Sequence, residues 1–160
     1  MTTMTTPTDS PPVPTLGEQV RGAVAASAAS RRFTNPEVEY IHATAQSLLR
    51  AGRMDKALSM LVVCVLYRPH NSKYLLSLGM CHRRLHNDHQ ALQAFAMATA
   101  MDPMNYDAAL QVGECLLRLR RVDESRKVLG ALVECAKQVE QAARPAARAK
   151  VLLELAGAAA

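Results

Sequence analysis

The chain has 160 residues, of which 49% are hydrophobic, and 19 basic against 14 acidic residues give it a net charge of +5. This length suits a single domain with a real core. No apolar stretch approaches the roughly 20 residues that a membrane-spanning helix needs, so we expect a soluble protein. Aromatic residues make up only 4% and Trp is absent, whereas Ala, Leu, Met and Arg are abundant, which predicts an all-α fold.

The N-terminal region divides into two segments. Residues 1–15, "MTTMTTPTDSPPVPT", form a Thr- and Pro-rich tract with little to bury, which predicts a disordered tail. Residues 16–30 are Ala-rich with Leu16, Val20 and Val24 on one stripe, which predicts a helix that packs on another surface. The twin arginine that follows lacks the neighbouring segments of an export signal, so we expect a cytoplasmic protein.

The rest of the chain repeats itself with a period of 34 residues. The middle copy shows the pattern best, with Gly79, Ala91, Phe95, Ala98 and Pro103 at its fixed places. This period and pattern are typical of the tetratricopeptide repeat, a pair of antiparallel helices. Stacked repeats of this kind need a cap at each end. We predict a single domain over residues 16–160, with an N-terminal helix at 16–30, repeats at about 38–71, 72–105 and 106–139, and a C-terminal helix at about 142–157.

The repeated residue types have physical reasons. Gly79 and Gly113 allow the two helices of a pair to approach closely, and Phe95 fills the space between repeats. Pro69 and Pro103 end the second helix of a pair and start the turn into the next repeat. The pattern therefore predicts a helical solenoid and not merely a helical composition.

Cys81, His82, His86 and His89 lie close enough in sequence to raise the question of a metal site or a thiol catalyst. Their spacing is not one that zinc sites use, and no acid/base pair or phosphate-binding loop accompanies them. Repeat geometry explains them as packing and turn residues. We predict no metal, no cofactor and no enzymatic activity. We also expect four reduced thiols in a reducing compartment, namely Cys64, Cys81, Cys115 and Cys135.

The basic run "RLRRVDESRK" is a weak candidate for nucleic-acid binding. Asp123 and Glu124 interrupt it, and no aromatic residue is interleaved for base stacking. A solvated helix turn explains the run better, so we expect no direct nucleic-acid partner.

The first helix of each repeat supplies the predicted binding surface. Positions 2, 5, 9 and 12 of a repeat line the concave side of such a solenoid. We name these twelve residues the groove positions: Glu39, His42, Gln46 and Leu49; Lys73, Leu76, Met80 and Arg83; Asp107, Leu110, Glu114 and Leu117. All of them except Glu39 and Asp107 form the predicted site.

Two interpretations of the groove positions stay open. Leu and Met mixed with a few charges suit an extended peptide with apolar anchors. Pockets for those anchors would form around five residues: Leu49, Leu76, Met80, Leu110 and Leu117. The alternative is that these apolar residues are extra core that the C-terminal helix covers.

Three short segments carry a family resemblance. "CVL" at 64–66, "LSLGMC" at 76–81 and "GECLL" at 113–117 resemble segments of the SycD/LcrH/IpgC class of type III secretion chaperones, over about residues 35–135. Members of this class are small cytoplasmic three-repeat proteins of Gram-negative bacteria. They hold the hydrophobic translocator proteins before export.

The resemblance implies a function and partners. It implies a client segment of the form Pro/Val-x-Leu-x-x-Pro in the groove, a homodimer contact through the N-terminal helix, and an AraC-type regulator as a further partner. The chain departs from the family at His42, Gln46 and Leu49, where members carry tyrosines. The client is therefore open, and the alternative function is a repeat scaffold or co-chaperone for another secretion component such as a needle subunit.

Overall fold

The computed structural model describes residues 33–158. The predicted tail at 1–15 and the predicted helix at 16–30 lie outside the described residues. Within them the chain is helical and contains no strand, so the predicted all-α fold is confirmed. The helices are α2 (Asn35–Arg50), α3 (Met54–Tyr67), α4 (Ser72–Arg84), α5 (Asp88–Met101), α6 (Tyr106–Arg118), α7 (Val122–Cys135), the 3-10 helix η1 (Glu140–Ala142) and α8 (Ala143–Ala158).

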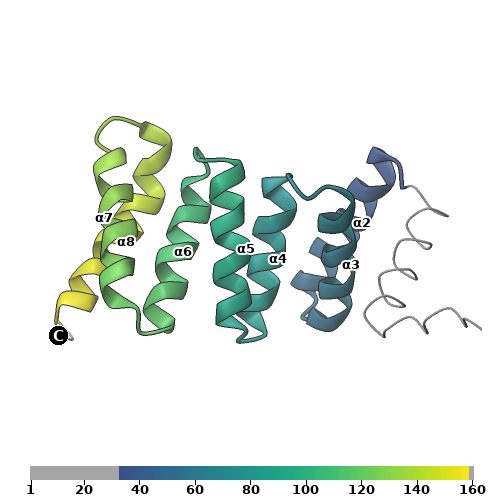
Figure 1. Cartoon of the computed structure of the whole chain (residues 1–160), viewed down its shortest axis with the longest axis horizontal. Helices are drawn as coiled ribbons and strands as arrows, with labels where there is room; N and C mark the ends of the chain where they lie inside the picture. Colours follow the sequence, from purple (N-terminus) through teal and green to yellow (C-terminus); the bar gives the residue numbers. More distant parts are fainter. Residues whose placement is uncertain (1–32, 159–160) are drawn as a thin grey trace, which may run out of the picture. The chain divides into compact units, whose positions relative to one another are not determined.

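Neighbouring helices of the compact unit that starts at Asn35 pack against each other in chain order. Figure 1 shows them side by side, with α2 and α3, α4 and α5, and α6 and α7 as three antiparallel pairs. α8 follows the last pair and contacts both α7 and α6. This is the tetratricopeptide arrangement that the 34-residue period predicts.

The close approach within two of the pairs depends on glycine. A Cβ atom on Gly79 would lie 2.6 Å from the ring of Phe95, and one on Gly113 would lie 2.3 Å from Cδ2 of Leu129. Neither distance leaves room for a methyl group, because carbon atoms in contact lie about 3.5 to 4 Å apart. The predicted role of these glycines is confirmed.

The three turns inside the pairs share one backbone geometry. Gly52, His86 and Arg120 have φ angles of 74°, 59° and 60°, and they are spaced by the repeat period. In each turn the next residue closes the helix end, as when Asn87 N donates to His82 O over 2.9 Å. Such left-handed helix ends favour glycine. His86 is therefore a turn residue.

The turns between the pairs are built differently. Pro69 and Pro103 lie two residues beyond the ends of α3 and α5, where a helix can no longer continue. Asn71 and Asn105 then start α4 and α6, because each side chain accepts a first-turn backbone N–H, over 3.1 and 3.0 Å. Proline followed by asparagine thus ends one repeat and begins the next.

The core lies within the helix pairs and between neighbouring pairs. Leu61, Phe95 and Leu129 occupy equivalent places on the three second helices, and all are 0% exposed. Burial of such side chains contributes about 1.5 to 3 kcal/mol each relative to exposure. None of the described helices is long and apolar enough to cross a bilayer.

Candidate functional site

A buried polar cluster links the first two repeats at the groove positions. His42 on α2 is 4% exposed, and its Nε2 lies 2.9 Å from the Oγ of Ser77 on α4. Ser77 Oγ donates to Lys73 O over 2.9 Å and accepts from Gln46 Nε2 over 2.7 Å. His42 Nε2 also lies 3.3 Å from Gln46 Nε2, so the three side chains form one connected cluster. The cluster joins α2 to α4.

The environment of His42 favours the neutral form of its imidazole. Burial lowers the pKa of His42 below its ordinary value of 6.5, and the charge of Lys73 lowers it further, while Glu39 acts in the opposite direction. The ring lies 4.9 Å from the ring of Tyr74, centroid to centroid. His42 is therefore a packing residue that joins α2 to α4.

At the rim of the same surface, Glu39 joins two groups of α4. Its carboxylate accepts from Lys73 Nζ over 2.8 Å and from the hydroxyl of Tyr74 over 2.6 Å. These bonds hold the pKa of Glu39 below its usual value. Burial, and then the bond to Glu39, raise the pKa of Tyr74 to about 12. The Glu39–Lys73 pair is half exposed, so it fixes register more than it adds stability.

The middle repeat presents the apolar part of the site. Leu76 and Met80 are each only partly buried on α4. Both pack against the cluster of Ala91, Phe95 and Cys115, so their inner atoms belong to the core. The rest of each side chain remains accessible on the surface. Leu76 and Met80 are therefore two predicted groove residues that combine core contacts with accessible apolar surface.

In the third repeat the structure supports the alternative interpretation for Leu110, namely that this residue is core next to the C-terminal helix. Leu110 is 4% exposed and belongs to a cluster that includes Ala146 and Ala149 of α8, and Leu117 packs against the same cluster. Leu110 is therefore core in the cluster that α8 completes, whereas Leu117 keeps part of its surface accessible. Leu110 forms no open apolar pocket, and its small exposed surface lies in a polar cleft beside α8.

Leu49 in the first repeat is also core. It is 4% exposed and packs with Ala45, Ala57 and Leu61, so it too forms no open pocket. Of the ten predicted site residues, the structure buries His42, Leu49 and Leu110, exposes Lys73, and leaves Gln46, Leu76, Met80, Arg83, Glu114 and Leu117 partly accessible.

The C-terminal end of the groove positions is a polar cleft of about 530 Å³ between α4, α6 and α8. At its base, Glu114 Oε2 accepts from Arg83 Nη1 over 2.7 Å and Glu114 Oε1 accepts from Arg148 Nε over 2.5 Å. Arg83 also donates to Gln111. The side chain of Glu114 is only 11% exposed, so this one carboxylate holds three helices together in a partly dry site.

Two residues of this cleft were not predicted from the sequence. Arg144 and Arg148 of α8 line it, and each lies one repeat period after a groove position, Leu110 and Glu114 respectively. α8 thus takes the place of the first helix of a fourth repeat. Extending the 34-residue period past residue 139 would have found both arginines.

The cysteines and histidines that raised the question of catalysis are separate in the structure. Burial raises the pKa of Cys64 and of Cys115 to about 11 and also raises that of Cys81. Protonated thiols of this kind are poor nucleophiles. All four cysteines are free. Within residues 33–158, no three His, Cys, Asp or Glu side chains come together to hold a metal ion.

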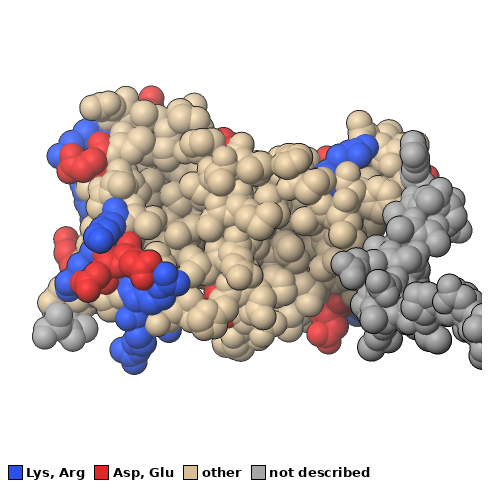
Figure 2. Space-filling view, viewed as in Figure 1, with Lys and Arg blue, Asp and Glu red and all other residues tan. Residues whose placement is uncertain are grey.

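A second surface escaped the sequence analysis, because only the first helices were considered. Figure 2 shows a face that is nearly free of charge over α3 and α5, whereas charged side chains gather toward the α7 end. Its exposed apolar residues are Val62, Leu66, Met97, Met101 and Met104, at 41% to 64% exposure. The signal in the sequence was the lack of any charge after Lys56 in α3 and after Asp88 in α5.

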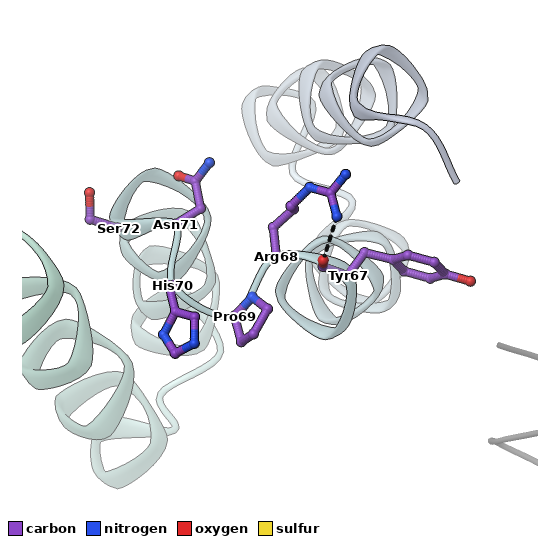
Figure 3. Close-up of a pocket in the computed structure, with 6 residues that line it drawn as sticks. All are labelled: Tyr67, Arg68, Pro69, His70, Asn71 and Ser72. Carbon is purple, nitrogen blue, oxygen red and sulfur yellow. Dashed lines mark hydrogen bonds between the residues drawn. The ribbon is translucent and has the colours of Figure 1, made fainter. Parts of the chain in front are cut away.

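The turn between α3 and α4 contains a shallow pocket lined by residues 67–72. Figure 3 shows one hydrogen bond within this turn, in which Arg68 Nη1 donates to Tyr67 O over 3.0 Å. Arg68 also donates to Asn35 of α2, and Asn71 caps α4. The residues that line the pocket all belong to this one turn.

Comparisons with known proteins agree with this architecture. Residues 87–151 match the family model described as tetratricopeptide repeat. No curated protein sequence matches the chain.

Solved structures give closer parallels. PcrH from Pseudomonas aeruginosa is 25% identical with a TM-score of 0.73, over 81% of this chain and 98% of PcrH. PcrH in complex with the chaperone-binding region of PopD matches with a TM-score of 0.74 at 25% identity, over 80% of this chain and 96% of PcrH. The Yersinia enterocolitica chaperone SycD, solved with a peptide of the translocator YopD, matches at 17% identity with a TM-score of 0.72, over 79% and 97% of the two chains. The predicted resemblance to type III secretion translocator chaperones is confirmed in the structural neighbours.

Proposed function

We propose that this chain is a type III secretion chaperone that binds a hydrophobic translocator protein and keeps it soluble before export. The observation that carries the proposal is the shared fold with PcrH, a protein solved with the chaperone-binding region of PopD, over 80% of this chain. The open apolar side chains of Leu76 and Met80 on α4 support it, since a peptide-binding repeat surface needs such anchors.

In the proposed complex an extended client segment lies along the groove positions. Leu76 and Met80 take apolar side chains of the client, and Met80 can adapt to differently shaped anchors because its thioether side chain is flexible. Gln46 and Lys73 beside them offer partners for peptide carbonyl and amide groups, which fixes register. Proline residues in the client favour an extended backbone before binding and so reduce the entropy lost on binding.

The burial of Leu49 and Leu110 restricts the kind of client segment that the surface can bind. With both residues in the core, the apolar anchors concentrate on the middle repeat, and the C-terminal end of the surface is polar. A client therefore needs one short apolar stretch, followed or preceded by polar residues. This requirement is more restrictive than pockets spread along all three repeats.

Other features of the family stay predictions for this chain. They are a cytoplasmic location, a homodimer contact through residues 16–30, and an AraC-type regulator as an additional partner. His42, Gln46 and Leu49 stand where family members carry tyrosines, and this departure favours a second candidate function, a co-chaperone for another secreted subunit such as a needle protein.

Co-expression distinguishes the two functions. The tagged chain would be co-expressed with each reading frame beside its gene, purified, and its bound proteins identified by mass spectrometry. We expect a stoichiometric complex with a protein that contains long apolar segments and that is insoluble without the chaperone. Stable capture of only a small, wholly polar helical subunit would contradict the translocator function and support the second one.

A further inference from the structure

We propose that the polar cleft at the C-terminal end of the groove positions binds an acidic side chain of the client, next to the client's apolar segment. We name it the arginine cleft, formed by Arg83, Gln111, Glu114, Arg144 and Arg148. The inference rests on the proposed function, because it assigns a second recognition element to the same client.

The arginine cleft contains guanidinium groups that are already held in position to bind a carboxylate. Glu114 positions Arg83 and Arg148 by accepting one nitrogen of each guanidinium, over 2.7 and 2.5 Å. Arg148 uses its Nε for this bond, and its two Nη groups make no hydrogen bond within the described part of the chain. An arginine held in this way presents a fork of donors that matches the two oxygens of a carboxylate.

Arg144 adds an unpaired positive charge at the same place. It is exposed, lines the cleft, and makes no hydrogen bond or ion pair with residues 33–158. It also lies in the first turn of α8, where the helix dipole favours negative charge. Glu114 is already matched by two arginines, so a further anion is attracted to the donors that remain, against the opposing charge of Asp107 on the cleft wall.

The arginine cleft continues the apolar part of the site. Met80 and Arg83 are three residues apart on α4, and Arg144 and Arg148 lie one repeat period beyond groove positions. Side chains three residues apart on a helix lie on the same face. A client whose apolar anchors contact Leu76 and Met80 therefore reaches the cleft by extending along the stack. The carboxylate that binds in the cleft is then a side chain of the client, within a few residues of the client's apolar anchors.

Fluorescence anisotropy with designed peptides tests this assignment. Two fluorescein-labelled, C-terminally amidated peptides share the core Pro-Val-Ala-Leu-Ala-Ala-Pro and carry, beyond a Gly-Ser spacer on both sides, either Glu pairs or Gln pairs. Amidation removes the terminal carboxylate, so that only side chains differ. Each peptide is titrated with the full chain, with Arg144→Gln/Arg148→Gln, and with Lys127→Gln/Lys150→Gln, a control that removes the same charge from exposed sites outside the cleft.

We expect the Glu-flanked peptide to bind the unmodified chain on the order of fivefold more tightly, which corresponds to the upper range of about 1 kcal/mol for partly exposed ion pairs. The arginine double variant should lose this preference, and the lysine double variant should keep most of it. Circular dichroism confirms that both variants are folded.

Three outcomes would overturn the assignment in distinguishable ways. Equal affinity of the two peptides for the unmodified chain, with binding that Leu76→Glu abolishes, rejects the arginine cleft and leaves the proposed function intact. A preference that both double variants lose equally shows general charge attraction and also rejects the cleft. Failure of both peptides to bind, together with failure of co-expression to capture a client, rejects the inference and the proposed function together.

Discussion

The middle and third repeats carry a leucine at the same groove position, Leu76 and Leu110, yet the two side chains differ in burial. Leu76 on α4 stays partly accessible, whereas Leu110 on α6 is 4% exposed and belongs to the cluster that α8 completes. Position within a repeat therefore determines the direction of a side chain. Its accessibility depends on the helix that stacks next along the solenoid. This difference supports the proposed peptide-binding role of the middle repeat and a structural role for Leu110 in the third.

The largest expected effect tests the structural role of the third repeat. Leu129→Glu places a carboxylate in the cluster that α8 completes, at a position that is 0% exposed and packed against Gly113, and should lower the free energy of unfolding by about 5 kcal/mol. Leu129→Met conserves volume and should cost less than about 1.5 kcal/mol. Urea denaturation of both variants measures this. A Leu129→Glu protein as stable as wild type would show that this cluster is not buried in solution.

Phe95→Ala tests whether the core of the middle repeat is separate from its open surface. Phe95 is 0% exposed against Gly79, so its truncation leaves a cavity and should cost about 3 to 5 kcal/mol of stability. Client affinity at a temperature where the variant is folded should change little. Thermal and urea denaturation give the stability, and anisotropy with the client segment gives the affinity. A large affinity loss in the fully folded variant would contradict the separation.

Glu114→Gln tests how much the Glu114 carboxylate, which binds Arg148 of α8, contributes to stability. It removes the charge that Arg83 and Arg148 share and should cost about 1 to 2 kcal/mol, because the side chain is only 11% exposed. The matched control is Glu124→Gln, whose partner Arg121 is well exposed, and it should change stability by less than about 0.5 kcal/mol. Equal effects of the two substitutions would show that the Glu114 network adds no more than a surface pair.

The smallest expected effect is the loss of stability at acidic pH that the buried imidazole of His42 causes. Burial lowers the pKa of His42, so as the pH falls the imidazole is protonated in the unfolded chain before it is protonated in the folded chain. The stability that the neutral imidazole provides is complete above the ordinary pKa of 6.5 and is lost as pH falls through that value toward the folded pKa. Melting temperatures from pH 8 to about pH 5 should fall less steeply for His42→Gln than for wild type. Parallel curves for the two proteins would contradict this assignment.

Much of the fold could be predicted from the sequence, because the repeat is encoded locally. The 34-residue period fixes which residues face the partner helix, and Gly79 against Phe95 follows from that spacing. The shared turn geometry of Gly52, His86 and Arg120 could have been found in the same way. It was missed because only one of the three residues is glycine, so residue type conceals a common backbone conformation.

The site could be predicted only in part. The first helices were located correctly, but the accessibility of Leu49 and Leu110 depends on packing between elements that the repeat pattern does not describe. The third repeat has Lys137 where the other two have Pro69 and Pro103, so the equivalence of α8 to a first helix, with Arg148 in register with Glu114, was not apparent. Polar links across repeats, such as His42 with Ser77, also need three-dimensional geometry.

The most direct test of the proposed binding surface is client affinity after substitution of the open apolar residues. Leu76→Glu and Met80→Glu would be compared with Leu66→Glu, a control that is 64% exposed on the face formed by α3 and α5. Isothermal titration with the client segment found by co-expression gives the dissociation constants, and circular dichroism confirms the fold. A charge in a desolvated anchor site should weaken binding by on the order of 100-fold for Leu76→Glu and Met80→Glu, and Leu66→Glu should bind like wild type. If folded Leu76→Glu and Met80→Glu proteins keep wild-type affinity, the groove positions of the middle repeat are not the client-binding surface.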